Sequence, residues 1–427
     1  MSTDLRVLRP EEWDKWYGKL VLAFGGVEEP PEERALWNGL TEFDRFIGAW
    51  DGDECVGTAG AFSFRMTVPG GALVKAAGIT MVSVAATHRR RGLLTSMKRR
   101  QLDDIRSWGE PLAVLTASEP VIYGRFGYGA ATQQMRAEID TSRVRLTVPP
   151  GTDDVRLRLA EPAADAVRDA CEAVYARQVP TRPGMLARLP GWEGLPLLDP
   201  PADRKGSSPL QCVLAERIGG REAPSIEGGG GRREGEVVGY ARYFNKPDWD
   251  TAGPKGTIEL RDLEALDPAA YVALWRFLFD IDLTSTVKTY NRPVDDALLH
   301  LVSDVRRCAL NLRDSLYVRL VDVGAALEAR TYQAPVDVVF EVEDAFCPWN
   351  EGRWRLSGDA KGASCERTTD SADLALSVRE LGSAYLGGVS LASLAAAGRV
   401  RELRQGALAE ASLGFSAAVA PWLPHGF

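Results

Sequence analysis

A short basic loop between an apolar strand and an amphipathic helix is the part of this sequence best suited to chemistry. Residues 79–84 alternate large and small apolar side chains, which predicts a strand. The run 89–92 (Arg-Arg-Arg-Gly) follows, and apolar residues then recur at helical spacing over 93–108, with Gly109 placed to end the helix. The first amides of such a helix are unpaired and point at the loop, where a pyrophosphate can bind. Gly92 lets the backbone approach the phosphates, and the arginines complement their charge.

A second motif follows the next predicted strand, residues 112–116. Residues 123–129 contain three glycines and three aromatic side chains, a density that suits a surface which a ligand approaches closely. Taken alone, the basic loop is also typical of a solvated face, and Tyr123 is also typical of a packing residue. Together the two motifs favour a phosphate-bearing ligand with a phenol beside it as a proton donor.

The run from Val82 to Gly129 resembles the Eis (enhanced intracellular survival) acetyltransferases, a branch of the GNAT superfamily, and the resemblance covers essentially the whole chain. The ending at 420–427 adds an aromatic residue at the extreme C-terminus, as in that family. The resemblance implies acetyl-CoA as cosubstrate, Tyr123 as general acid and the terminal carboxylate of Phe427 as general base. It implies acetyl-CoA contacts by Val82, Ser83, Val84, Arg90, Arg91, Gly92, Leu93, Leu94, Thr95, Ser118 and Glu119.

The same resemblance implies a pocket for the acceptor amine. Its residues in this chain are Trp13, Phe24, Trp37 and Met81. Aminoglycoside-modifying members have two acids beside this pocket, at positions where this chain has Gly26 and Gly426. Three nearby acids are candidates to compensate: Glu28, Glu29 and Glu32. We therefore expect an N-acetyltransferase that acts on primary amines of a cationic small molecule, of aminoglycoside or polyamine type, with protein lysines as a further acceptor class.

A terminal carboxylate is an unusual general base. Its unperturbed pKa is about 3.5, whereas an efficient base at neutral pH has a pKa near 7. Burial against aromatic side chains such as Trp422 raises the pKa of a carboxyl group, and a rise of about two units costs roughly 2.7 kcal/mol. Most C-termini are frayed. Pro421 and Pro424 reduce the entropy lost when this tail docks, so we expect it to be ordered.

Composition narrows the class of protein. A chain of 427 residues suggests two or three domains, and its net charge of −8 argues against nucleic acid as the main partner while favouring a cationic substrate. The sequence contains neither a bilayer-length apolar run nor a recognisable signal peptide, so we expect no membrane association and a cytoplasmic location. Six scattered cysteines are expected to be buried thiols, and three unclustered histidines predict no metal site.

The order of predicted elements indicates an α+β protein. The resemblance to the Eis family implies tandem GNAT folds, each a mixed sheet with flanking helices, over 1–150 and 151–312, and a sterol-carrier-like α/β domain over 313–427. In the first domain, residues 55–61 and 64–68 are predicted as separate strands. The second domain has no Arg-x-x-Gly loop after a strand, so we expect it to bind no coenzyme.

Two further segments complete the organisation. The glycine-rich run 227–236 is expected to be a surface loop, and a strand over 316–323 leading into a helix over 324–329 is expected to open the third domain. By resemblance, the end of that domain reaches the first domain's active site and the protein is a homo-oligomer, a hexamer. The alternative function is a lipid carrier or interaction protein with a vestigial coenzyme fold. The intact Arg89–Leu94 run and Tyr123 favour the enzyme.

Overall fold

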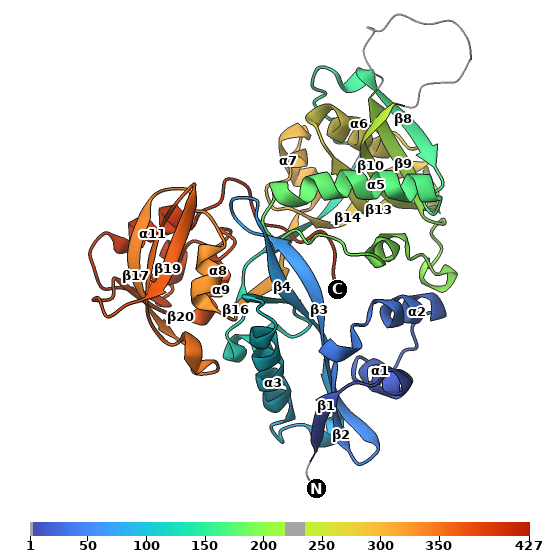
Figure 1. Cartoon of the computed structure of the whole chain (residues 1–427). Coiled ribbons are helices and arrows are strands. Elements are labelled where there is room, and N and C mark those ends of the chain that lie inside the picture. Colours follow the sequence, from blue (N-terminus) through green and yellow to red (C-terminus); the bar gives the residue numbers. More distant parts are fainter. Residues whose placement is uncertain (1–2, 218–234) are drawn as a thin grey trace, which may run out of the picture. The chain divides into compact units, whose positions relative to one another are not determined.

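The computed structural model describes residues 3–217 and 235–427, in which the chain forms two compact units (Figure 1). The first unit comprises Met1–Gln134, Pro180–Leu189 and Arg313–Phe427, and the second comprises Met135–Val179 and Pro190–Leu312. The expected glycine-rich loop lies, up to residue 234, outside the described residues. Within the described ranges, no helix has both the length and the apolar character needed to cross a bilayer.

The first unit is built on a seven-stranded sheet of order β1-β2-β3-β4-β5-β16-β6. The strands are β1 (Asp4–Val7), β2 (Ile47–Asp51), β3 (Glu54–Thr67), β4 (Leu73–Val84), β5 (Leu112–Thr116), β16 (Leu316–Leu320) and β6 (Gly129–Ala130). The two strands expected over 55–68 are one strand, β3. No turn residue interrupts its centre, where Phe62 and Phe64 are both buried, so the ladder with β4 continues through it.

Strand β16 corrects a second expectation. Its sequence predicts a strand that opens the third domain, but the strand lies in the first sheet, antiparallel to β5 and next to β6. All five of its residues are buried, which is typical of an interior strand. The predicted helix after it is α8 (Val323–Glu328).

Helices cover both faces of this sheet. Helices α1 (Trp13–Ala23) and α2 (Pro31–Leu40) lie on one side of β3 and β4, and α3 (Leu93–Ser107) lies on the other (Figure 1). The buried residues of α3 recur at helical spacing, as the sequence predicts, and Gly109 adopts a φ of 67° directly after its last turn. A short helix, α4 (Pro120–Tyr123), follows β5.

The most consequential feature of the sheet is that β4 and β5 separate. They pair in parallel only over three positions, Ala76 to Gly78 against Leu112 to Val114. Beyond Gly78, β4 continues to Val84 paired with β3 alone, and the end of β5 pairs with β16. The main-chain groups on one edge of β4 are therefore free of sheet partners beside the loop that leads into α3.

The rest of the first unit is a smaller sheet with its own helices. Its strand order is β19-β18-β17-β20-β21: β17 (Val336–Glu343), β18 (Gly352–Asp359), β19 (Gly362–Arg367), β20 (Leu374–Ser377) and β21 (Val400–Glu402). Its further helices are α9 (Val378–Ala384), α10 (Leu391–Ala396) and α11 (Ala407–Phe415), and α9 packs on β16 and β6. The tail after α11 is docked rather than frayed, because the Trp422 amide donates to the Pro183 carbonyl at 2.9 Å and Arg182 Nη1 donates to the Ala420 carbonyl at 2.6 Å.

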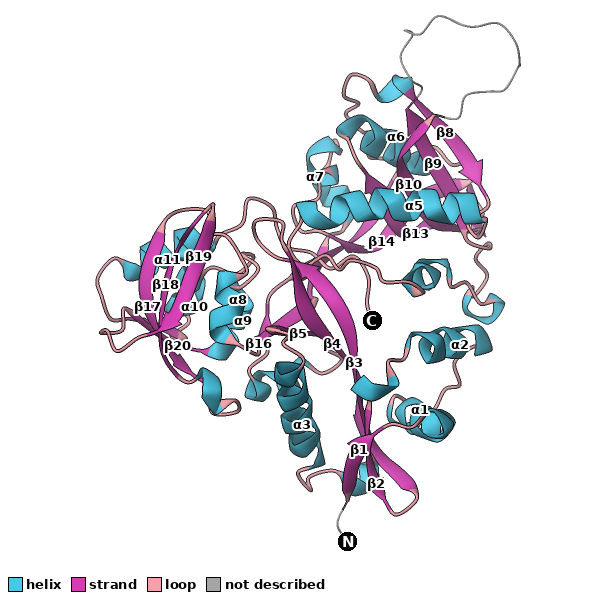
Figure 2. Ribbon diagram, viewed as in Figure 1, coloured by secondary structure: helices cyan, strands magenta, loops and turns pink. Residues whose placement is uncertain are grey.

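The second unit is also a sheet with a helix on each face (Figure 2). Its strand order is β15-β7-β14-β13-β10-β9-β8: β7 (Gln133–Asp140), β8 (Val155–Ala160), β9 (Gln211–Arg217), β10 (Glu236–Lys246), β13 (Gly256–Ala265), β14 (Thr284–Arg292) and β15 (Asn311–Asp314). Alternate residues of β9 pack against α5 (Asp165–Gln178) and α6 (Pro268–Phe279), so the two helices cover opposite faces. The unit further contains α7 (Leu298–Leu301) and a two-stranded hairpin of β11 (Trp249–Asp250) and β12 (Gly253–Pro254).

Candidate active site

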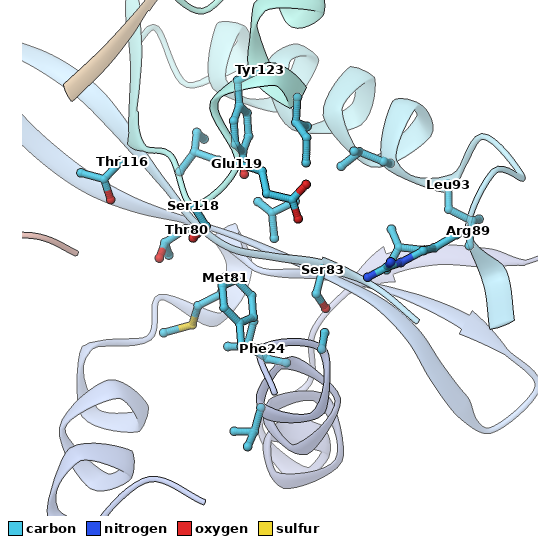
Figure 3. Close-up of a pocket in the computed structure, with 18 of the residues that line it drawn as sticks. Phe24, Thr80, Met81, Ser83, Arg89, Leu93, Thr116, Ser118, Glu119 and Tyr123 are labelled. Carbon is cyan, nitrogen blue, oxygen red and sulfur yellow. The ribbon is translucent and has the colours of Figure 1, made fainter. Parts of the chain in front are cut away.

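A cavity of about 800 Å³ in the first unit lies beside the free edge of β4 (Figure 3). Its wall combines β4, the loop and first turn of α3, the end of β5, the α4 turn, helices α1 and α2, and the last residue of the chain. In Figure 3 the Tyr123 ring enters from one side, whereas Phe24 and Met81 lie on the other. This volume is in the range of sites for small molecules and cofactors.

Most of the residues singled out from the sequence line this cavity. They are Val82, Ser83, Val84, Arg90, Gly92, Leu93, Leu94, Thr95, Ser118, Glu119, Phe24, Trp37, Met81, Tyr123 and Phe427. Of the residues expected to contact acetyl-CoA or to form the acceptor pocket, two do not line it. Arg91 is exposed on the loop. Trp13 is only 3% exposed, because its ring stacks on Trp16 and contacts the tilted Tyr17 ring within α1.

Strand β4 is distorted where it lines the cavity. A bulge lies opposite Ala59, and within it Met81 has a φ of 53°, a left-handed conformation that is costly for a residue with a side chain. Thr58 Oγ1 donates to the Met81 carbonyl at 2.7 Å and lies 2.7 Å from Ser83 Oγ, so hydroxyl groups hold the distorted segment from β3. Such strain clusters at functional sites, and here it turns the Met81 side chain into the cavity.

The loop before α3 has the features of an anion site. Gly92 has a φ of 81° and precedes the first helical residue, where no side chain caps the helix. The first amides of α3 are therefore available to a ligand. Arg89 extends from this loop into the cavity (Figure 3), and Arg90 also lines it. His88 Nε2 lies 3.3 Å from Asp51 Oδ2, an interaction that ties the loop to the end of β2.

Tyr123 is positioned by the α4 turn. Pro120 begins this turn directly after Glu119, so the phenol follows the loop that carries Ser118 and Glu119. Its ring is half-buried and meets the buried Tyr128 ring edge to face, with centroids 6.0 Å apart. Burial and the Glu119 charge raise the pKa of Tyr123 to about 12, so the phenol is protonated at neutral pH.

The last residue of the chain lies against β4. Thr80 Oγ1 donates to the main-chain oxygen of Phe427 at 3.2 Å. The Phe427 ring meets the Phe64 ring at 5.0 Å and 62°. A Cβ at Gly78 would lie 3.2 Å from Phe427 Cε2 and 2.2 Å from Phe64 Cε2, so the absent side chain at this position makes room for both rings. Thr80 is not among the site residues named from the sequence. The alternation of side chains along β4 is the signal that could have found it.

Acidic side chains line the α1 and α2 side of the cavity. Glu29 accepts a hydrogen bond from the Tyr17 hydroxyl, and Glu33 Oε1 accepts one from Trp37 Nε1 at 3.3 Å. Of the three acids proposed from the sequence, Glu29 lines the cavity, whereas Glu28 and Glu32 do not. Glu33 was missed. Its helical spacing from Trp37 on α2 is the signal that could have found it.

Three family models match the chain. An acetyltransferase (GNAT) domain matches residues 4–131, a second acetyltransferase (GNAT) domain matches 230–320, and a sterol carrier protein domain matches 323–424. These matches confirm the expected fold class, tandem GNAT folds followed by a sterol-carrier-like domain.

Relatives similar to this chain extend over its length. An uncharacterized N-acetyltransferase of Streptomyces avermitilis is 73% identical over 100% of both chains. N-acetyltransferase Eis of Mycobacterium tuberculosis is 35% identical over 91% of this chain and 91% of its own. Among solved structures, Eis1 from Mycobacterium abscessus is 35% identical, with a TM-score of 0.82 over 100% of each chain.

Proposed function

Because the chain belongs to the Eis family of GNAT N-acetyltransferases, we propose that it transfers acetyl from acetyl-CoA to a primary amine of a small polycationic acceptor, of aminoglycoside or polyamine type. One observation carries this proposal: the basic loop, the Tyr123 phenol, the last residue and the carboxylates of Glu29 and Glu33 all line the same cavity. Protein lysines remain a second acceptor class for the same chemistry.

Three observations support a fit to acetyl-CoA. The uncapped first turn of α3, preceded by Gly92 with open space at its Cβ position, suits the approach of a pyrophosphate. Arg89 and Arg90 supply the complementary charge. The free edge of β4 presents main-chain groups to a ligand that enters the gap between β4 and β5. Acetyl-CoA supplies the activated acetyl group, as the GNAT fold implies.

In the proposed reaction a C–N bond forms and the C–S bond of the thioester breaks. Main-chain amides of β4, over 82–84, polarise the thioester carbonyl. The terminal carboxylate of Phe427 accepts the proton that the attacking amine loses, and the Tyr123 phenol donates a proton to the departing sulfur. The raised pKa of Tyr123 keeps that proton in place before the reaction, since the phenol ionises only well above neutral pH.

The acceptor class follows from the charges in the cavity. Glu29 and Glu33 lie on the side formed by α1 and α2, where the aromatic rings of Tyr17 and Trp37 also line the wall. Carboxylates and aromatic faces both attract ammonium groups. A polyamine or an aminoglycoside carries additional ammonium groups that can bind these acids while one neutral amine reacts, which a monoamine cannot do.

The test is release of CoA thiol from acetyl-CoA, measured with spermidine, kanamycin A and n-butylamine as acceptors. We expect turnover with the first two and a much smaller kcat/KM with n-butylamine. Tyr123→Phe is expected to lower kcat by about 10² or more while CoA still binds. Wild-type kcat in Tyr123→Phe would remove the phenol from the mechanism, and an absence of amine-dependent thiol release would refute the enzyme assignment for these acceptors.

The alternative, a lipid carrier, has less support. Two cavities in the sterol-carrier-like part are lined by residues such as Asp337, Asp359, Lys361 and Glu410, which suit an acyl chain poorly. From the family resemblance we also propose a cytoplasmic homo-oligomer, a hexamer. Light scattering during gel filtration tests the assembly.

A further inference from the structure

A buried lysine lies behind the proposed general acid. Lys98 is on the face of α3 that packs into the core, between the apolar residues Met97 and Leu102, and its side chain is 0% exposed. A lysine in this position is unusual, because a buried ammonium group costs several kcal/mol unless it is paired. In the described part of the chain, no carboxylate acts on the Lys98 ammonium group, whose pKa is perturbed by burial.

The surroundings of Lys98 are two phenol rings and one amide. Its Nζ lies 5.4 Å from the centroid of the Tyr123 ring and 5.7 Å from that of Tyr128. It donates to Gln101 Oε1 at 2.9 Å, and Gln101 Nε2 in turn donates to the Gly60 carbonyl of β3 at 2.9 Å. One donor of the ammonium group is thus anchored to the sheet, while the group itself is held over the two aromatic rings.

We propose that Lys98 is a positioning residue for Tyr123, which lowers the cost of phenolate formation when the phenol gives up its proton. This inference rests on the proposed role of Tyr123 as general acid. A cation near a neutral phenol gains a modest cation–π attraction, whereas the same cation near a phenolate gains a full charge–charge attraction. The attraction between Lys98 and Tyr123 is therefore stronger after the phenol has lost its proton than before. An interaction that strengthens during the reaction in this way raises kcat rather than changing KM.

Charged and titratable groups around the pair are few. Tyr123 and Tyr128 face Lys98 directly, the Glu119 charge acts on Tyr123, and Arg319 and the Cys347 thiol act on Tyr128. Burial lowers the pKa of Lys98 to about 7. Its folded-state pKa is depressed, so the ammonium form is present below pH 7 and is lost as the pH rises through that value. The assistance to Tyr123 should follow the same dependence.

The experiment is a double-mutant cycle in the thiol-release assay, with spermidine at saturation and the acetyl-CoA concentration varied. Lys98→Met, which preserves length and removes the charge, is expected to lower kcat about ten-fold at pH 6 and to leave the KM for acetyl-CoA within about two-fold. In the Tyr123→Phe background the same substitution is expected to change kcat by less than about two-fold, since no phenolate forms there. Arg100→Met, which removes a charge from the exposed face of α3, is the matched control and should leave kcat unchanged.

The pH dependence separates this role from a structural one. The ratio of wild-type to Lys98→Met kcat should be largest at pH 6 and approach one at pH 9, and amine titration cancels in the ratio. An equal loss in both backgrounds, a ratio independent of pH, or no loss at all would overturn the proposal. Lys98→Gln provides the same comparison if Lys98→Met fails to fold. If Tyr123→Phe itself retains wild-type kcat, the proposed general acid is wrong, whereas a slow Tyr123→Phe beside a fast Lys98→Met refutes Lys98 alone.

Discussion

The proposed base can be tested by adding one residue to the chain. In an extended variant with alanine after Phe427, the carboxylate becomes a neutral peptide carbonyl, and the new carboxylate belongs to a residue whose Cα lies about 3.8 Å farther on. The amide can still accept the Thr80 hydrogen bond, so the Phe427 ring and its contact with Phe64 need not move. The variant thus removes the proton acceptor while preserving the docking of the tail.

The magnitude follows from the role proposed. Loss of a general base lowers kcat by about 10² to 10⁴, which is about 2.7 to 5.4 kcal/mol of transition-state stabilisation. Phe427→Ala is the matched variant, because it keeps the terminal carboxylate and removes the ring. The edge-to-face contact with Phe64, at 5.0 Å, is worth about 0.5–1.5 kcal/mol beyond burial, so a loss of about two- to ten-fold through poorer positioning is expected.

The assay compares kcat for spermidine in the wild type and the two variants, with CoA binding by calorimetry as the control for an intact cavity. We expect the extended variant to bind CoA normally and to lose far more activity than Phe427→Ala. The reasoning is refuted if the extended variant turns over at the wild-type rate, or if Phe427→Ala is the more damaged of the two.

Two further predictions address acceptor binding and stability. Glu29→Gln and Glu33→Gln should each raise the KM for spermidine about two- to five-fold, because each removes one partly exposed ion pair, and should change the KM for n-butylamine little. Glu28→Gln, which lies outside the cavity, is the control. Equal shifts in KM for both amines would count against a polycationic acceptor. Asp344→Asn should lower the free energy of unfolding of the first unit by about 3–5 kcal/mol, measured by chemical denaturation. Arg319 Nη2 donates to both buried Asp344 oxygens, at 2.9 and 2.6 Å, and would lose its counter-charge. An unchanged denaturation midpoint would contradict this prediction.

Much of the proposed coenzyme site is visible in the sequence because it is local. The strand end at Val82–Val84, the loop with Gly92, the first turn of α3 and the α4 turn with Tyr123 follow one another within about forty residues. Strand β5 has the bounds that the sequence pattern predicts, because a short apolar run marks it directly. Chain order thus brings these residues together with little help from distant segments.

Other features depend on partners that are distant in the chain. Thr80 and Phe427 are 347 positions apart, and β16 joins the first sheet beside β5 rather than opening a sheet of its own. Nothing in the periodicity of a strand names the strand it pairs with, since alternation reports only which face is buried. The position of Lys98 between two phenols has the same origin: helical spacing places it on the buried face of α3, but only the packing of that face against the Tyr123 and Tyr128 turns determines which rings its charge meets.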